Sequence, residues 1–139
     1  MRKIEFDSGI EEFRLQGGGV LRFNPGDPNI YARFLEAEEK FKDIENGLHQ
    51  QAKTLEGAPT GDAAVTLTAQ ADRKIKELLD WVFGGGNDFH KALGGVNLLA
   101  VAANGKRVVA NLFGALEEIL AAGAERFTAE EAEAIRADR

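Results

Sequence analysis

A periodic run of apolar residues between positions 30 and 55 constrains this chain more than any other feature of its sequence. Its members, which we call the apolar seam, are Ile30, Phe34, Ala37, Phe41, Ile44, Leu48 and, seven residues further on, Leu55. Steps of three and four residues place side chains along one narrow line of a long α-helix. Mostly charged residues fill the positions between them, so the other faces of this helix are polar. A lone helix cannot bury such a line, so another part of the chain, a second copy or a partner must pack on it.

The residues around the seam predict a helical hairpin. Asp27 can accept hydrogen bonds from the first free amides of a helix, and Pro28 suits the first helical position. Residues 57–61 are typical of a loop, and apolar residues at helical spacing follow over 62–82, which predicts an antiparallel partner helix. A straight helix of about 28 residues measures about 42 Å. A domain of this size is about 30 Å wide, so we expect part of the hairpin to project.

Short strands are expected before this hairpin. Apolar and polar residues alternate over residues 3–23, with breaks at Ser8-Gly9 and at Gly17-Gly18-Gly19. This pattern predicts two or three strands in a hairpin or meander, which needs a helix to cover its apolar face.

Further helices are expected after it. They are a helical turn capped by Asn87 or Asp88, a short helix over 96–103, an amphipathic helix over 106–122 that Gly123 ends, and a last helix from the capping box at 128–131. The sequence therefore predicts a mostly helical α+β fold: a β hairpin or meander packed on a helical hairpin and two or three further helices. We expect one domain over residues 1–125, with residues 126–139 weakly docked or frayed.

Composition narrows the function. The 139 residues carry a net charge of −6, which disfavours nucleic-acid binding because that needs a basic face. The sequence contains no cysteine, so disulfides and thiol catalysis are excluded. The most apolar stretch, residues 96–103, is far too short to span a bilayer, and the first residues lack the apolar core of a signal peptide.

The polar residues form no recognisable catalytic or metal-binding set. His49 and His90 are the only histidines, and neither has enough potential ligands at a suitable spacing. Ser8 is the only serine, with no histidine near it in the sequence. The glycine runs at 17–19 and 84–86 lack the context of a phosphate-binding loop. We therefore expect no enzyme, no cofactor and no metal.

Aromatic residues around the second glycine run leave two interpretations open. Trp81 and Phe83 can close the local core, which is the simpler interpretation. Phe89, in a glycine-flanked loop, would be a binding anchor if exposed, because loop aromatics offer a large contact area at low entropic cost.

Two short motifs in this order resemble a known family. Residues 21–28 read Leu-Arg-Phe-Asn-Pro-Gly-Asp-Pro and lead into the long acidic helix, and residues 81–88 read Trp-Val-Phe-Gly-Gly-Gly-Asn-Asp. Over residues 4–125 this layout is similar to the tail assembly chaperones of long-tailed bacteriophages and prophages. Of the family's turn motif, Phe83, Gly84 and Gly86 match by position.

The resemblance implies a non-enzymatic partner-binding protein in the host bacterial cytoplasm. Such chaperones coat the long helical tape measure protein while the tail tube polymerises, and in some phages a frameshifted extension recruits tail tube subunits. The expected partner-binding residues are Phe34, Phe41, Ile44, Leu48 and Phe89, which would shield apolar segments of the client. Many weakly bound copies along one client would add their affinities. The alternative is a structural virion subunit, a tail or head-completion protein, that forms homo-oligomers through the helix at 30–55.

Overall fold

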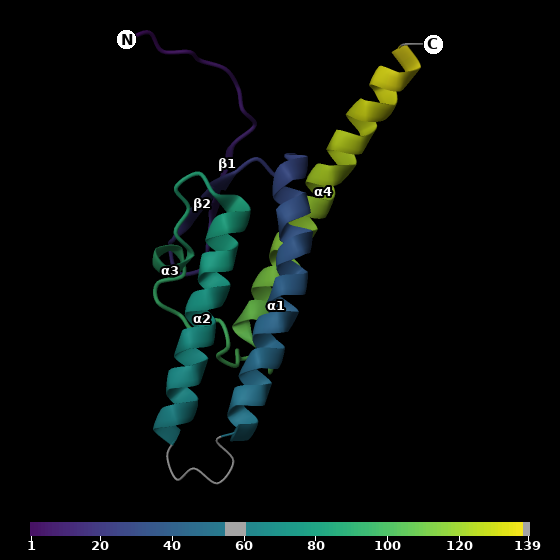
Figure 1. Ribbon diagram of the computed structural model, residues 1–139. Coiled ribbons are helices and arrows are strands. Elements are labelled where there is room, and N and C mark those ends of the chain that lie inside the picture. Colours follow the sequence, from purple (N-terminus) through teal and green to yellow (C-terminus); the bar gives the residue numbers. More distant parts are fainter. Residues whose placement is uncertain (55–60, 138–139) are drawn as a thin grey trace.

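The computed structural model describes residues 1–54 and 61–137 (Figure 1). Its elements are β1 (Glu11–Arg14), β2 (Val20–Phe23), α1 (Pro28–Thr54), α2 (Gly61–Phe83), α3 (Phe89–Ala92) and α4 (Val108–Ala137). The two strands form an antiparallel hairpin, and the rest of the regular structure is helical. This confirms the predicted mostly helical α+β fold.

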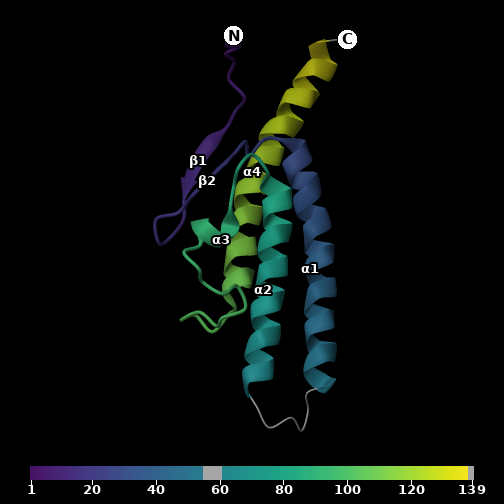
Figure 2. The same cartoon turned by 60° about the vertical axis from the view of Figure 1, so that its left-hand side comes forward.

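Helices α1 and α2 run antiparallel to each other, and α4 packs alongside α1 (Figures 1 and 2). At the end that carries Thr54 and Gly61, α1 and α2 extend beyond the first turn of α4. The expectation that part of the helical hairpin projects is confirmed. At the opposite end, α4 extends beyond the other helices.

The β hairpin packs its apolar face on the helices. Phe13 lies opposite Leu21 in the register, and the ring of Phe13 stacks on Phe23 with centroids 4.7 Å apart. Leu21 and Phe23 are buried, and the Phe23 ring lies 4.7 Å from that of Phe83 at the end of α2. The small sheet is thus stabilised by helical cover, as expected for two strands that are marginal alone.

A third strand over residues 3–7 does not form. A two-residue turn at Ser8-Gly9 would place Lys3 opposite Arg14 and Glu5 opposite Glu12, and like charges in such positions are destabilising. Tight hairpin turns also need positive φ at the first central residue. The first central residue of this turn would be Ser8, but among the described residues only glycines have positive φ, and the glycine here, Gly9 at 77°, comes second.

One core joins all the elements. Its most deeply buried large side chains come from β2, α1, α2, α3, the segment before α4, and α4 itself. They are Leu21, Phe34, Ile75, Leu79, Val82, Phe89, Leu98 and Leu120.

Two predicted helices were wrong. Residues 96–103 form turns and one isolated bridge, from Val101 to Arg107, rather than a helix. The last two predicted helices are one, because α4 continues through Gly123 and through the supposed capping box. The hydroxyl of Thr128 donates to the carbonyl of Ala124 one turn earlier, as within a helix.

Gly123 is a packing residue rather than a helix terminator. A Cβ atom at this position would lie 1.8 Å from the carbonyl oxygen of Pro25. The glycine therefore lets α4 cross the turn between β2 and α1 at close range. Local hydrogen bonds stabilise that turn. The side chain of Asn24 accepts from the Gly26 amide, and the side chain of Asp27 accepts from the Asn29 amide.

Candidate functional site: an open groove in the helical hairpin

The first half of the apolar seam is buried within the subunit. Phe34 is 1% exposed, and Ile30 and Ala37 are buried with it. The rings of Phe34 and Phe41 each form a T-shaped pair with Phe113 on α4, with centroid distances of 5.7 and 5.2 Å. This part of the seam is therefore core. Phe34, predicted to bind a partner, is not available to one in this structure.

The second half of the seam faces an open groove. Ile44 and Leu48 are only partly buried and line this groove. Phe41 is also partly buried, but it packs on Phe113 and does not line the groove. Beyond the first turn of α4 the two hairpin helices continue without it. The space between them is a groove of about 590 Å³. Leu55, the last seam position, lies outside the described residues.

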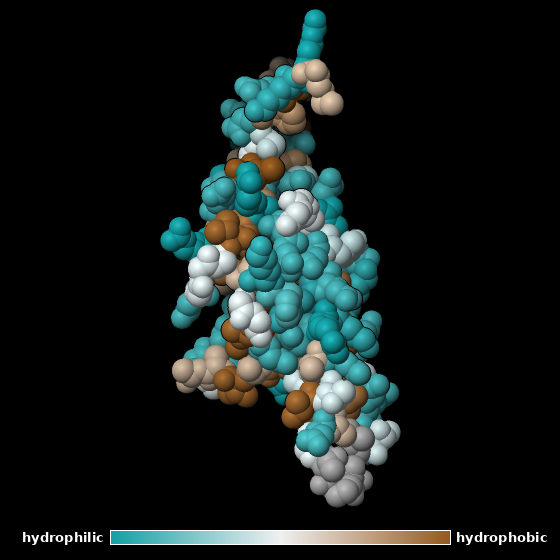
Figure 3. All heavy atoms as spheres, turned by 90° about the vertical axis from the view of Figure 1, so that its left-hand side faces the viewer, coloured by the Kyte–Doolittle hydropathy of each residue, from teal (hydrophilic) through white to brown (hydrophobic). Residues whose placement is uncertain are grey.

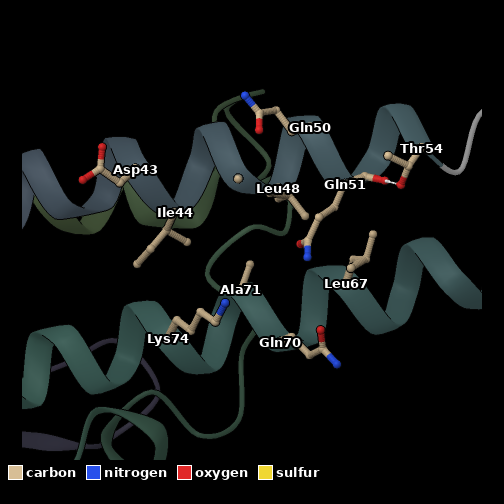
Figure 4. Close-up of a pocket in the computed structure, with 11 residues that line it drawn as sticks. Asp43, Ile44, Leu48, Gln50, Gln51, Thr54, Leu67, Gln70, Ala71 and Lys74 are labelled. Atoms are coloured by element: carbon tan, nitrogen blue, oxygen red, sulfur yellow. Dashed lines mark hydrogen bonds between the residues drawn. The ribbon is translucent and has the colours of Figure 1, made fainter.

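The groove combines an apolar floor with polar edges. Ile44 and Leu48 point from α1 toward α2, while Leu67 and Ala71 point back toward α1 (Figure 4). The remaining lining residues are Asp43, Gly47, Gln50, Gln51, Thr54, Gln70 and Lys74. An apolar centre with a polar rim is the usual anatomy of a protein-binding surface.

A second apolar hollow lies where α1 begins and α4 passes it. It measures about 260 Å³ and is lined by Tyr31, Leu35 and Phe127, among others. Leu35 is 53% exposed and Phe127 41% exposed. Sequence reasoning missed this hollow, because the predicted break at Gly123 separated Phe127 from the helix that carries it.

Other exposed apolar side chains are scattered. The face shown in Figure 3 is mostly hydrophilic, with small separate apolar patches. Scattered apolar side chains of this kind are normal for a protein surface.

Phe89 lies at the centre of the core. It is 0% exposed, and its ring lies 5.4 Å from that of Phe83. The expectation that Phe89 is an exposed anchor is wrong; Asp88 caps α3 and directs the following Phe89 inward. Phe83 closes the core as expected, but Trp81 is 42% exposed, with the amine of Lys40 lying 4.2 Å from its ring centroid.

The glycine turn after α2 supports the β hairpin. Gly84, Gly85 and Gly86 all have positive φ, which only glycine adopts readily. This path brings Asn87 beside β2. There the Asn87 side chain accepts from the amide of Arg22 and donates to its carbonyl, both at 2.8 Å. The turn motif thus has a structural role: it presents a side-chain amide that pairs with one edge of the sheet.

Among the carboxylates of residues 1–54 and 61–137, Glu38 and Asp80 have shifted pKa values, and both shifts have structural causes. Burial and the nearby charge of Glu117 raise the pKa of Glu38 above its usual 4.5. Burial also raises the pKa of Asp80 above 3.8, although a hydrogen bond from the Phe89 amide opposes the shift. His49 and His90 are exposed, and within residues 1–54 and 61–137 no three potential metal ligands cluster.

A buried ion pair escaped the sequence analysis. The amine of Lys76 lies 2.9 Å from one carboxylate oxygen of Asp72, and the other oxygen accepts from the Leu98 amide at 2.7 Å. Both charged side chains are buried. The i, i+4 spacing of the two charges was visible in the sequence, but the segment that covers them was not.

Comparisons with protein-family models, with curated proteins and with solved structures found no match to this chain. Of the helices in the described ranges, none combines the length and apolarity needed to cross a membrane.

Proposed function

We propose that this protein is a non-enzymatic tail assembly chaperone of a long-tailed phage or prophage. It would bind apolar helical segments of the tape measure protein in the host bacterial cytoplasm and keep them soluble until the tail tube encloses them. The observation that carries the proposal is the groove at the projecting end of α1 and α2, where Ile44 and Leu48 continue the seam and every lining residue comes from α1 or α2.

The chemistry of the groove suits such a client. An amphipathic helix can place its apolar face against Ile44, Leu48 and Leu67, while the polar rim pairs with its flanks. The net charge of −6 keeps the rest of a coated client soluble. Of the five expected partner-binding residues, Ile44 and Leu48 line the groove. Phe34 and Phe89 are buried in the core, and Phe41 packs on Phe113.

The test is co-expression with the tape measure protein encoded by the same genome. The proposal predicts that the client becomes soluble and that the two proteins purify together, whereas the client alone aggregates. Failure to form a complex and failure to solubilise the client would together overturn it.

The rival function is a structural subunit of the virion that oligomerises through the same projecting helices. A chaperone leaves before the particle is complete, so purified particles should lack this chain. Stoichiometric amounts in washed particles, detected by mass spectrometry, would support the rival.

A further inference from the structure

The two edges of the β1–β2 hairpin differ in whether their outward backbone groups have hydrogen-bond partners. The amide of Leu15 bonds across the hairpin, so the alternation of antiparallel pairs directs the backbone groups of Glu12 and Arg14 away from β2. On the other edge, the outward groups of Arg22 are both bonded by Asn87. For Glu12 and Arg14, no other backbone or side-chain partner of these groups lies within residues 1–54 and 61–137. One edge is closed and the other is open.

The chain also carries an unpaired segment with the pattern of a strand. Residues 3–7, which we call the N-terminal arm, run away from the helices (Figure 1). Ile4 and Phe6 are 85% and 78% exposed and alternate with charged residues. The Ser8 carbonyl that follows the arm accepts from the side chain of Asn24, so the chain between the arm and β1 is bonded to the turn after β2.

The charges of the arm disfavour an antiparallel pairing with β1 and favour a parallel one. Folding back places Lys3 beside Arg14 and Glu5 beside Glu12, which are like charges. A parallel alignment instead places Lys3 beside Glu12 and Glu5 beside Arg14, both opposite charges. The same alignment puts Ile4 beside Phe13 on the apolar face of the sheet. Parallel strands need a connection of a dozen or more residues, so an arm this close to β1 in the sequence cannot pair in this way within one chain.

We propose that the arm of a second copy adds to the open edge of β1 as a parallel third strand. The Ile4 amide would donate to the Glu12 carbonyl, and the Ile4 carbonyl would accept from the Arg14 amide, which fills two of the four outward backbone groups of Glu12 and Arg14. The apolar side chains of the arm would cover Phe13, which is only partly buried. Exposed edges are otherwise sites of uncontrolled pairing, and strand addition is a common way to fill them. The proposal uses a surface distant from the groove and is independent of the proposed function.

The first experiment measures molar mass by size-exclusion chromatography with light scattering over a range of concentrations. The wild-type chain should associate as concentration rises. Arg14→Glu and Glu5→Arg should each raise the concentration at half-association by about tenfold, because each turns an attractive cross-strand pair into a repulsive one. Combining the two substitutions restores opposite charges and should restore association. A monomer at every concentration, or association that ignores both substitutions, would overturn the proposal.

The second experiment fixes the register and direction. The natural chain has no cysteine, so single cysteines can be placed at will. Mixing Lys3→Cys with Glu12→Cys should give a disulfide-linked heterodimer, because paired strands bring Cα atoms within disulfide range. Lys3→Cys mixed with Arg14→Cys is the matched control, since only the antiparallel register brings these positions together. Preferential cross-linking of the control pair would refute the parallel strand.

Discussion

Replacing Lys76 by methionine should destabilise this protein far more than a lysine substitution on its surface. The Lys76 side chain is 3% exposed and that of Asp72 is 9% exposed, and their charged atoms lie 2.9 Å apart. Methionine keeps most of the volume of lysine but leaves the Asp72 carboxylate buried, with the Leu98 amide as its remaining partner. Breaking a buried pair from one side costs about 3–5 kcal/mol. That is a large share of the roughly 5–15 kcal/mol that stabilises a typical domain.

A double substitution separates the charge from the hydrogen bond. Asp72→Asn combined with Lys76→Met removes both charges, while the asparagine oxygen can still accept from the Leu98 amide. The cost should fall to about 1–3 kcal/mol, the penalty for the buried amide donors that lack a partner. Asp72→Ala with Lys76→Met should be worse than the asparagine variant, because it also leaves the Leu98 amide without its acceptor.

Urea unfolding followed by far-UV circular dichroism measures these differences. The control is Lys42→Met, because Lys42 forms a 3.3 Å pair with Glu39 in which both side chains are well exposed. Exposed pairs contribute at most about 1 kcal/mol. If Lys76→Met costs no more than Lys42→Met, the pair is not buried, and the packing of the segment before α4 on α2 is wrong.

Three further predictions concern the packing of α4, the sheet edge and pH. Gly123→Ala should lower the free energy of unfolding in urea by about 1–3 kcal/mol, because α4 must move away from Pro25. The control is Gly114→Ala, where a Cβ atom meets nothing within 4 Å and the free energy of unfolding should rise by about 0.5–1 kcal/mol. Equal effects of the two substitutions would refute the close crossing. Asn87→Ala should lower stability by about 1–3 kcal/mol and speed hydrogen exchange in β2, and unchanged exchange there would argue against the edge pairing. Glu38→Gln should stabilise the protein at neutral pH, because the raised pKa means that folding disfavours the carboxylate. This gain should shrink as pH falls through the raised folded-state pKa and vanish below the usual value of 4.5; a gain that grows on acidification would contradict the sign.

The elements with a strong local signal were predictable from the sequence. The seam, Asp27-Pro28 and the loop after it located the helical hairpin to within a residue or two of the observed α1 and α2. The glycine run at 17–19 and the flanking alternation located β1 and β2 in the same way. In these cases periodicity and turn chemistry agree with the tertiary structure.

The errors occurred where tertiary contacts override a local signal. Gly123 is typical of a helix end, yet its lack of a side chain serves the crossing with Pro25. Apolar residues over 96–103 suit a short helix, but they form turns and one isolated bridge, and Asp72 accepts a hydrogen bond from the Leu98 amide there. Phe89 follows glycines in a loop, yet the Asp88 cap places it in the core.

The seam was predictable from the sequence, but which part of it lines the groove was not, for a related reason. Helical spacing places Phe34 and Leu48 on the same line, and nothing local tells which of them α4 covers. That depends on where α4 begins relative to α1, which brings Phe113 against Phe34 and Phe41, while no residue of α4 lines the groove at Ile44 and Leu48.

The most direct measurement of the central proposal is the affinity of helical tape measure segments for the wild-type protein and for a variant with a filled groove. Gly47 lines the groove, and a Cβ atom there meets nothing within 4 Å. Gly47→Leu should therefore fill the groove and stabilise α1, since leucine favours helix over glycine. Val65→Asp, at a 69% exposed position outside the groove lining, is the control for an unrelated surface change. Binding measured by calorimetry should weaken at least about tenfold, or 1.4 kcal/mol, for Gly47→Leu and stay unchanged for Val65→Asp. Undiminished binding by a stable Gly47→Leu variant would contradict a client-binding role for the groove.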